Sequence, residues 1–296
     1  MLSYTETPIQ EIKGVWLEKA QVRLLVKRED LNHPFVSGNK WWKLKYNLEE
    51  ARRLGFSKLL TFGGAYSNHI FATASAAKEN GFESIGIIRG EESLPLNPVL
   101  SFARSQGMVL RHISREAYRA KSKPSFVEKL KEDFGAFYLI PEGGTNALAI
   151  KGCEEFAQSL SKVEFDYLCL PVGTGGTMAG MVEGHHGKKE LIGFSVLKDA
   201  AFLAEEVRKL VLNYSGETFS NWKIETAYHF GGYAKTNSEL INFINSFHLE
   251  HTVPLDPVYT GKMMFGICDL IKKGFFNQGS TILALHTGGL PSAKNK

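Results

Sequence analysis

Short apolar runs alternate along this chain with stretches in which apolar residues recur every three or four positions. A continuous apolar run indicates a buried strand, and the three-to-four spacing indicates a helix. The runs predict strands at residues 22–26, 57–62, 84–89, 109–113, 136–140, 166–172, 191–196, 222–227 and 280–285. The spaced patterns predict helices at 70–80, 98–106, 126–133, 147–160, 202–212, 237–248 and 262–272. This order predicts an α/β protein with open, mostly parallel sheets covered by helices on both faces.

The length of 296 residues is enough for about two domains. No low-complexity linker divides the chain, so we expect the smaller domain to be inserted in the larger one. The predicted large domain comprises residues 1–42 and 147–296, and the predicted small α/β domain comprises residues 43–146. The segment 114–124 is basic and polar, which predicts an exposed loop.

One lysine lies where a helix is expected to begin. In residues 37–44, Ser-Gly-Asn-Lys-Trp-Trp-Lys-Leu, either Ser37 or Asn39 can cap the helix, which places Lys40 in its first turn. The helix dipole disfavours a cation there, so the amine has a reason to lose its charge. Such a lysine can bond covalently to a carbonyl compound, pyridoxal phosphate (PLP) included. The alternative is an ordinary surface lysine.

Composition excludes several classes of partner. The net charge of +4 is spread along the chain, so we expect neither nucleic-acid nor membrane binding, whereas a small anionic ligand is compatible with it. The N-terminus does not resemble a signal peptide. Three separated cysteines predict reduced, core-packing thiols and a cytoplasmic protein. The pair His185-His186 lacks metal-ligand spacing, so we expect exposed side chains and no metal.

A glycine-rich turn follows the strand predicted at 166–172. Gly173-Thr174-Gly175-Gly176-Thr177 brings backbone N–H groups and two hydroxyls to a helix N-terminus, which favours an anion such as phosphate. The alternative is a plain tight turn. Met178 stands where the third glycine of a dinucleotide fingerprint belongs, and residues 256–263 do not match a Walker A loop. A phosphorylated cofactor is therefore expected.

A second turn, Gly63-Gly64-Ala65-Tyr66-Ser67-Asn68-His69, brings a hydroxyl, an amide and an imidazole to another helix start. Free N–H groups at this place suit a carboxylate. The alternative is that Ser67 or Asn68 serves only as the helix cap.

Taken together, these stretches resemble one family, the PLP enzymes of the tryptophan-synthase β-like fold. Within it the chain is similar to 1-aminocyclopropane-1-carboxylate deaminases and D-cysteine desulfhydrases. The resemblance covers nearly the whole chain and rests on five ordered motifs, at residues 27–30 with 38–40, 67–69, 173–177, 256–262 and 286–289.

The resemblance implies PLP as the cofactor. Lys40 would carry it covalently and move protons at the substrate Cα. Asn68 would hydrogen-bond the phenolic oxygen of the cofactor, the turn 173–177 would hold its phosphate, and Thr260 would face the pyridine nitrogen. His286 is expected near the cofactor.

The resemblance also implies a small amino acid as the substrate. Ser67, with Asn68 and His69, would bind its carboxylate, and Ser67 would stand close to the reacting carbons. Tyr259 and Tyr233 would be phenols near the substrate. The family further implies a homodimer.

The chain departs from the family pattern at two cationic positions. Trp42 follows Lys40 where the family usually has an arginine, and Phe71 replaces an arginine after the Ser-Asn-His turn. These losses bear on substrate choice.

The predicted function is a deaminating lyase that releases a keto acid and ammonia. Thr260 stands where the cyclopropane deaminases have glutamate and the D-cysteine desulfhydrases have threonine. A hydroxyl can donate to a neutral pyridine nitrogen and offers no counter-charge, which predicts D-cysteine-like elimination, with cyclopropane deamination as the alternative. A racemase or dehydratase on the same fold, and a non-catalytic binder of a phosphorylated metabolite, also remain open.

Overall fold

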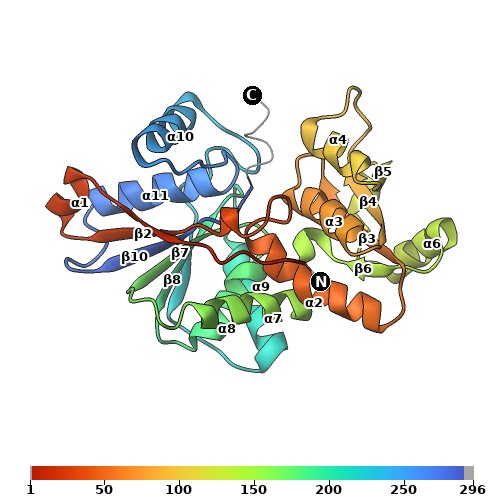
Figure 1. Cartoon of the computed structure of the whole chain (residues 1–296), viewed down its shortest axis with the longest axis horizontal. Coiled ribbons are helices and arrows are strands. Elements are labelled where there is room, and N and C mark those ends of the chain that lie inside the picture. The colour runs from red at the N-terminus through yellow and green to blue at the C-terminus, as the bar shows by residue number, and fades with distance from the viewer. Residues whose placement is uncertain (1, 290–296) are drawn as a thin grey trace.

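The structure of the protein is a computed structural model that describes residues 2–289. Its larger sheet has six strands in the spatial order β1-β2-β10-β7-β8-β9 (Figure 1). Their bounds are Ile9–Ile12, Arg23–Lys27, Thr281–Leu285, Tyr167–Val172, Glu190–Ser195 and Trp222–Glu225, in that order. Each neighbouring pair is parallel except β1 with β2.

The smaller sheet has four strands in the order β5-β4-β3-β6, and each neighbouring pair is parallel. Their bounds are Val109–Ile113, Glu83–Arg89, Lys58–Gly64 and Tyr138–Ile140, in that order. The predicted mostly parallel α/β architecture is therefore confirmed. All four strands lie inside residues 43–146, and the domain bounds themselves stay a prediction.

Helices cover both sheets on both sides. They are α1 Val15–Ala20, α2 Asn39–Arg53, α3 Asn68–Glu79, α4 Pro98–Ser105, α5 Arg115–Arg119, α6 Pro124–Phe134, α7 Ala147–Ser159, α8 Gly176–His185, α9 Phe202–Ser215, α10 Ser238–His251 and α11 Thr260–Lys272, with two short 3₁₀ turns at Glu29–Leu31 and Glu142–Gly144. In the larger sheet α10 and α11 lie on one side and α7, α8 and α9 on the other (Figure 1).

Strand β2 shows why the apolar runs are continuous. Leu24 and Val26 pack in the cluster under α1, α10 and α11, whereas Leu25 between them packs in the cluster under α7, α8 and α9. Successive side chains of a strand point to opposite faces, so both faces need apolar residues when both are covered. Each fully buried leucine contributes about 1.5–3 kcal/mol to folding.

Helix α2 connects the two sheets. Its residues Trp41, Trp42, Leu44 and Leu48 belong to the same continuous cluster as residues of α7 and of the smaller sheet. The ring of Trp42 stacks on Phe156 of α7, with centroids 5.0 Å apart and planes at 8°. The first turn of α2 is therefore held against the larger sheet while the rest of the helix extends toward the smaller one.

Two local predictions were wrong because long-range packing decides them. The segment predicted as a loop at 114–124 contains helix α5, which is capped by Ser114 and buries Tyr118 in the core of the smaller sheet. The pair His185-His186 was predicted to be exposed. His186 is exposed, but His185 is buried and its ring meets the ring of Phe165 edge to face. The sequence reading also missed β1 and α1.

The three cysteines are buried and free, which confirms their role in core packing. Across residues 2–289, no helix is long and apolar enough to cross a membrane. The same residues contain no group of His, Cys, Asp or Glu side chains placed to hold a metal ion.

Candidate active site

A cavity of about 560 Å³ lies where the two sheets face each other, and its volume is in the range of ordinary small-molecule sites. Its wall is built from segments that follow the carboxyl ends of four strands. These are residues 67–69 after β3, 142–143 after β6, 173–178 after β7 and 287–288 after β10. The neighbours β3 and β6, and likewise β7 and β10, mark the points where the order of strands reverses in each sheet. Open α/β sheets bind ligands at such points.

The site depends on how α2 begins. Gly38, not Ser37 or Asn39, is the cap residue, and no side chain caps the helix, so the predicted cap was wrong. Gly38 has φ of +69°, and a Cβ there would lie 1.9 Å from the carbonyl oxygen of Thr287. Only glycine permits both that φ and that close approach. The contact places the first turn of α2, with Lys40, beside the end of β10.

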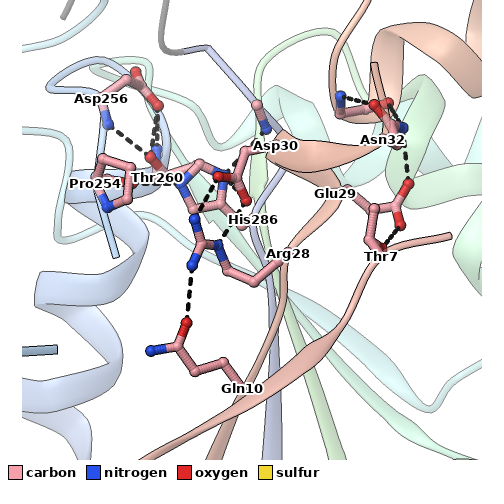
Figure 2. Close-up of polar contacts among 12 residues, drawn as sticks. Thr7, Gln10, Arg28, Glu29, Asp30, Asn32, Pro254, Asp256, Thr260 and His286 are labelled. Atoms are coloured by element: carbon pink, nitrogen blue, oxygen red, sulfur yellow. Dashed lines mark hydrogen bonds and ion pairs between the residues drawn. The ribbon is translucent and has the colours of Figure 1, made fainter. Parts of the chain in front are cut away.

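Buried carboxylates fix the segment before α2 (Figure 2). Glu29 is 1% exposed and accepts hydrogen bonds from Thr7, from the side-chain amide of Asn32 at 2.9 Å and from the Trp42 indole at 2.8 Å. Asp30 receives two hydrogen bonds from Arg28, at 2.9 and 2.8 Å. The motif at residues 27–30 is therefore an anchor for the turn that leads to Lys40.

Lys40 is half-buried in the wall of the cavity, in the first turn of α2 as predicted. Its Nζ donates to Asn39 Oδ1 at 2.9 Å. Burial, and then the positive charge of Lys43, lower the pKa of its amine to about 7. Near neutral pH a large share of the amine is therefore uncharged, which is the form that attacks a carbonyl or takes a proton.

The turn after β7 forms a cradle for an anion. The N–H groups of Gly175, Gly176 and Thr177 donate no hydrogen bond within residues 2–289. The Thr177 hydroxyl accepts from the Asn39 side chain at 2.8 Å.

Lys43 adds a cation to this cradle. It lies one turn after Lys40 on α2, and its Nζ donates to the Gly143 carbonyl and to Thr145 Oγ1. A Cβ on Gly176 would lie 3.2 Å from that Nζ, so the ammonium borders the turn. Burial lowers the pKa of Lys43 to about 8. Lys43 was not among the predicted site residues, although its spacing of three residues from Lys40 places both on the same helix face.

A second set of free donors begins α3. Ser67 caps the helix, and its Oγ accepts from the Ile70 N–H at 3.3 Å, so the proposed cap exists. The N–H groups of Asn68 and His69 meet no acceptor in the described part of the chain, nor does the Asn68 side-chain amide form a hydrogen bond there. The hydroxyl proton of Ser67 is also available. These donors suit a carboxylate, so Ser67 can serve as the helix cap and the binding of an anion here stays a prediction.

His69 is held in one tautomer. The Thr61 hydroxyl donates to the Ile140 carbonyl at 2.8 Å, so its oxygen accepts the Nε2–H of His69 at 2.8 Å. The other nitrogen, Nδ1, is buried and without a partner among residues 2–289. Burial, and then the charges of Lys40 and Lys43, hold the pKa of His69 well below its usual value. The ring is therefore neutral and presents Nδ1 as an acceptor.

Two phenols stand together at the cavity wall. The rings of Tyr233 and Tyr259 lie edge to face, with centroids 6.1 Å apart. Burial raises the pKa of both phenols, and the neighbouring Tyr233 raises the pKa of Tyr259 further. Both phenols therefore keep their protons near neutral pH.

Thr260 lies behind the wall of the cavity and is 0% exposed. Its hydroxyl donates to Asp256 Oδ2 at 2.7 Å and accepts the Asp256 N–H at 2.9 Å (Figure 2). An ionised carboxylate accepts only, which fixes this direction. The proton of Thr260 is therefore engaged by Asp256 in this structure, and its role toward a pyridine nitrogen stays a prediction. Thr260 offers a lone pair, and Asp256 supplies a negative charge behind it.

His286 is also behind the wall. It bonds the Pro254 carbonyl at 2.6 Å and lies 3.4 Å from Asp30 Oδ1, so it ties the end of β10 to two neighbouring segments.

The two positions where arginines are missing do not line the cavity either: Trp42 donates to Glu29, and Phe71 stacks on Phe102 with centroids 3.8 Å apart. A cation that the sequence analysis missed, Arg89, does line it.

The lowered pKa of Lys40 predicts unusual reactivity. In cofactor-free protein, competitive acetylation should modify Lys40 with an inflection near pH 7, because only the neutral amine reacts and it predominates above the pKa. Exposed lysines in the same sample should inflect near 10.4. In Lys43→Met the inflection should move to higher pH, since a neighbouring cation is removed. Mass spectrometry of labelled peptides measures both, and an inflection near 10 for Lys40 would contradict its burial.

Comparison with known proteins agrees with this geometry. The family model described as "Pyridoxal-phosphate dependent enzyme" matches residues 1–288. A protein of Pyrococcus abyssi named "Putative 1-aminocyclopropane-1-carboxylate deaminase" is 33% identical over 97% of this chain and 90% of its own length. A protein of Arabidopsis thaliana named "Bifunctional D-cysteine desulfhydrase/1-aminocyclopropane-1-carboxylate deaminase, mitochondrial" is 30% identical over 98% of this chain and 77% of its own.

A crystal structure described as an ACC deaminase homologue superimposes with a TM-score of 0.86 at 28% identity, covering 99% of this chain and 92% of that one. The fold is therefore the tryptophan-synthase β-like fold. These matches make the protein an enzyme, which removes the alternative of a non-catalytic binder. The chain belongs to the family of pyridoxal-phosphate-dependent enzymes, among the relatives named for cyclopropane deamination and D-cysteine desulfuration.

Proposed function

We propose that the protein is a deaminating lyase that eliminates a β-substituent from D-cysteine or a similar small amino acid. The observation that carries this proposal is one cavity that holds a lysine amine with a pKa of about 7 beside an anion cradle. The reaction releases the substituent, a keto acid and ammonia. Cyclopropane deamination is the second candidate, because relatives carry that name.

The residues present fit PLP. The free N–H groups of the turn 173–177, with Lys43 beside Gly176, would hold the phosphate. Lys40 would bond the carbonyl carbon, and the unpaired amide of Asn68 would meet the phenolic oxygen. Bound PLP supplies an electron sink for the pair released at the substrate Cα.

The chain's own groups then divide the remaining work. Ser67 with the N–H groups of Asn68 and His69 orients the substrate carboxylate. The neutral amine of Lys40, freed when the substrate amine takes its place on the carbonyl carbon, takes the Cα proton. The bond from Cβ to sulfur breaks, and sulfur leaves with the electron pair and a proton from Tyr233. Water then completes release of ammonia and pyruvate from D-cysteine.

Thr260 supports elimination over ring opening. A carboxylate in direct contact would hold a proton firmly on a pyridine nitrogen. Here the hydroxyl of Thr260 lies between the Asp256 carboxylate and the proposed position of the ring nitrogen. That carboxylate already accepts hydrogen bonds from the N–H groups of Val258, Tyr259 and Thr260 and from the Thr260 hydroxyl. The resulting sink is weaker, which suits a good leaving group such as a thiolate.

Lys40→Ala should abolish turnover and covalent cofactor attachment while leaving the fold intact. The reason is that the neutral amine of Lys40 is the group proposed to bond the carbonyl carbon of the cofactor. Borohydride reduction of the holoenzyme followed by peptide mapping measures the attachment, and circular dichroism checks the fold. A phosphopyridoxyl label on another lysine, Lys43 included, would refute the assignment.

Gly176→Asn should weaken PLP affinity at least about tenfold, because a hydrogen bond to a charged group contributes about 1.5–3 kcal/mol. A Cβ there would lie 2.8 Å from Thr145 Oγ1 and crowd Lys43. At saturating PLP, kcat should stay close to that of the wild type, since phosphate does not react. Titration of apoenzyme by visible absorbance measures affinity. Gly81→Asn is the matched control, because a Cβ there meets nothing within 4 Å. Equal affinities would place the cradle elsewhere.

The wild-type enzyme should release keto acid from D-cysteine with a kcat/KM at least about tenfold above that for 1-aminocyclopropane-1-carboxylate, about 1.4 kcal/mol in the barrier. The weaker sink around Thr260 is the cause. Steady-state keto-acid assays with both compounds decide it. Thr260→Ser keeps the hydroxyl and should keep the preference. A higher kcat/KM for the cyclopropane substrate would show that residue 260 does not set the reaction.

A further inference from the structure

One cationic side chain of the cavity wall, among residues 2–289, forms neither a hydrogen bond nor an ion pair. Lys43 is held by Gly143 and Thr145, and Lys121 pairs with Glu142 at 3.2 Å. Lys40 donates to Asn39. Arg89 lines the same cavity, and its guanidinium forms no hydrogen bond or ion pair within the described chain. An arginine carries five N–H donors, so this group is an unused recognition element.

The position of Arg89 is set by the smaller sheet. It is the last residue of β4 and pairs with Gly64, the last residue of β3, so it lies at the carboxyl ends of the strands that face the cavity. A Cβ on Gly64 would lie 3.5 Å from a terminal nitrogen of Arg89. The guanidinium therefore lies in contact range of Gly64, beside the turn that leads to Ser67.

The side chains of Tyr118 and Tyr233 indicate where the Arg89 guanidinium lies. Its carbon lies 5.6 Å from the ring centroid of the buried Tyr118, a cation–π contact that holds the plane of the group. Burial raises the pKa of Tyr233, and the charge of Arg89 opposes that rise, so the guanidinium is within electrostatic reach of this phenol. Arg89 is therefore on the substrate side of the cavity, near the proton donor assigned to the leaving group.

In the proposed function, the phosphate of the cofactor and the α-carboxylate of the substrate each already have binding groups. The phosphate has the cradle with Lys43, and the substrate α-carboxylate has the free N–H groups at the start of α3. Arg89 belongs to neither set. A guanidinium without a partner at a third position fits a third anion, and the substrate side chain is the part that remains.

We propose that the enzyme takes amino acids whose side chain ends in an anionic group, such as a carboxylate, and that Arg89 binds this group. The inference rests on the proposed function for the reaction and deepens it by naming the substrate class. For an S-carboxymethyl cysteine, the bond from Cβ to sulfur breaks and sulfur keeps the electron pair and gains a proton. Water then releases pyruvate and ammonia, with mercaptoacetate as the other product.

Two matched pairs of compounds test the proposal on the holoenzyme, each as the D and the L form. Aspartate and asparagine have nearly the same shape and differ in charge. Calorimetry measures the Kd of each without any turnover. S-carboxymethyl cysteine and S-methyl cysteine give the same pyruvate and differ in the charge of the leaving group. The wild type should favour the anionic member of each pair at least about tenfold, in Kd and in kcat/KM, since hydrogen bonds to charged groups are strong.

Arg89→Gln should remove the preference, and Arg89→Lys should restore part of it. Arg111→Gln is the control. Arg111 lies on the neighbouring strand β5, opposite Ile87, and does not line the cavity, so this variant should keep the preference.

Three results would overturn the inference: no preference in the wild type, equal weakening of both members by Arg89→Gln, or reduced PLP affinity in that variant. Equal weakening would assign Arg89 to the α-carboxylate, and reduced PLP affinity would assign it to the cofactor. If the binding preference is present but no compound yields pyruvate, the proposed reaction fails while the anion site stands. If pyruvate forms at equal rates from both conjugates, the anion site fails while the reaction stands.

Discussion

The buried carboxylate of Glu29 is the interaction on which the position of the reactive lysine depends. It accepts hydrogen bonds from Tyr4 and Thr7 in the N-terminal segment, from Asn32 in the following turn and from Trp42 in the first helical turn of α2. Lys27 of β2 forms an ion pair with it at 3.6 Å. A buried carboxylate is tolerated only when such donors satisfy it. Removing it would leave these donors unpaired, which costs about 1–3 kcal/mol for each buried group. Asn32 also bonds the N–H and the carbonyl of Gly38, so the same network fixes the residue that starts the helix.

The consequence is an electrostatic arrangement that favours an anionic ligand. With α2 fixed, Lys40 and Lys43 face the turn 173–177, whose N–H groups also carry partial positive charge. Burial opposes charge on both amines, and Lys43 opposes charge on Lys40. A phosphate in the cradle would compensate the charge of Lys43. The amine of Lys40 would stay the neutral group, because no carboxylate of residues 2–289 forms an ion pair with it.

The parts of this design that depend on local sequence were predictable. Continuous apolar runs revealed the parallel sheets, and the glycines around residue 175 revealed the cradle, because each pattern has one dominant physical cause. Other features depend on residues distant in sequence. Gly38 caps α2 because Thr287 approaches it, and Thr260 donates to Asp256 because the turn folds back on itself. Tyr118 turns a polar segment into a helix by burying its ring. Arg89 ends a strand like many surface arginines, and only the facing sheet makes it part of a cavity.

The division of the site between two sheets separates its two tasks. In the proposed function, the larger sheet and the first turn of α2 supply Lys40 and the cradle for the cofactor. The smaller sheet supplies the start of α3 and the end of β4 for the substrate, with Asn68 of α3 also reaching the cofactor. A change at Phe71 or Arg89 alters contacts made by the smaller sheet and leaves the cradle of the larger sheet in place. The loss of the family's arginine at Phe71 therefore lies outside the groups proposed to hold PLP.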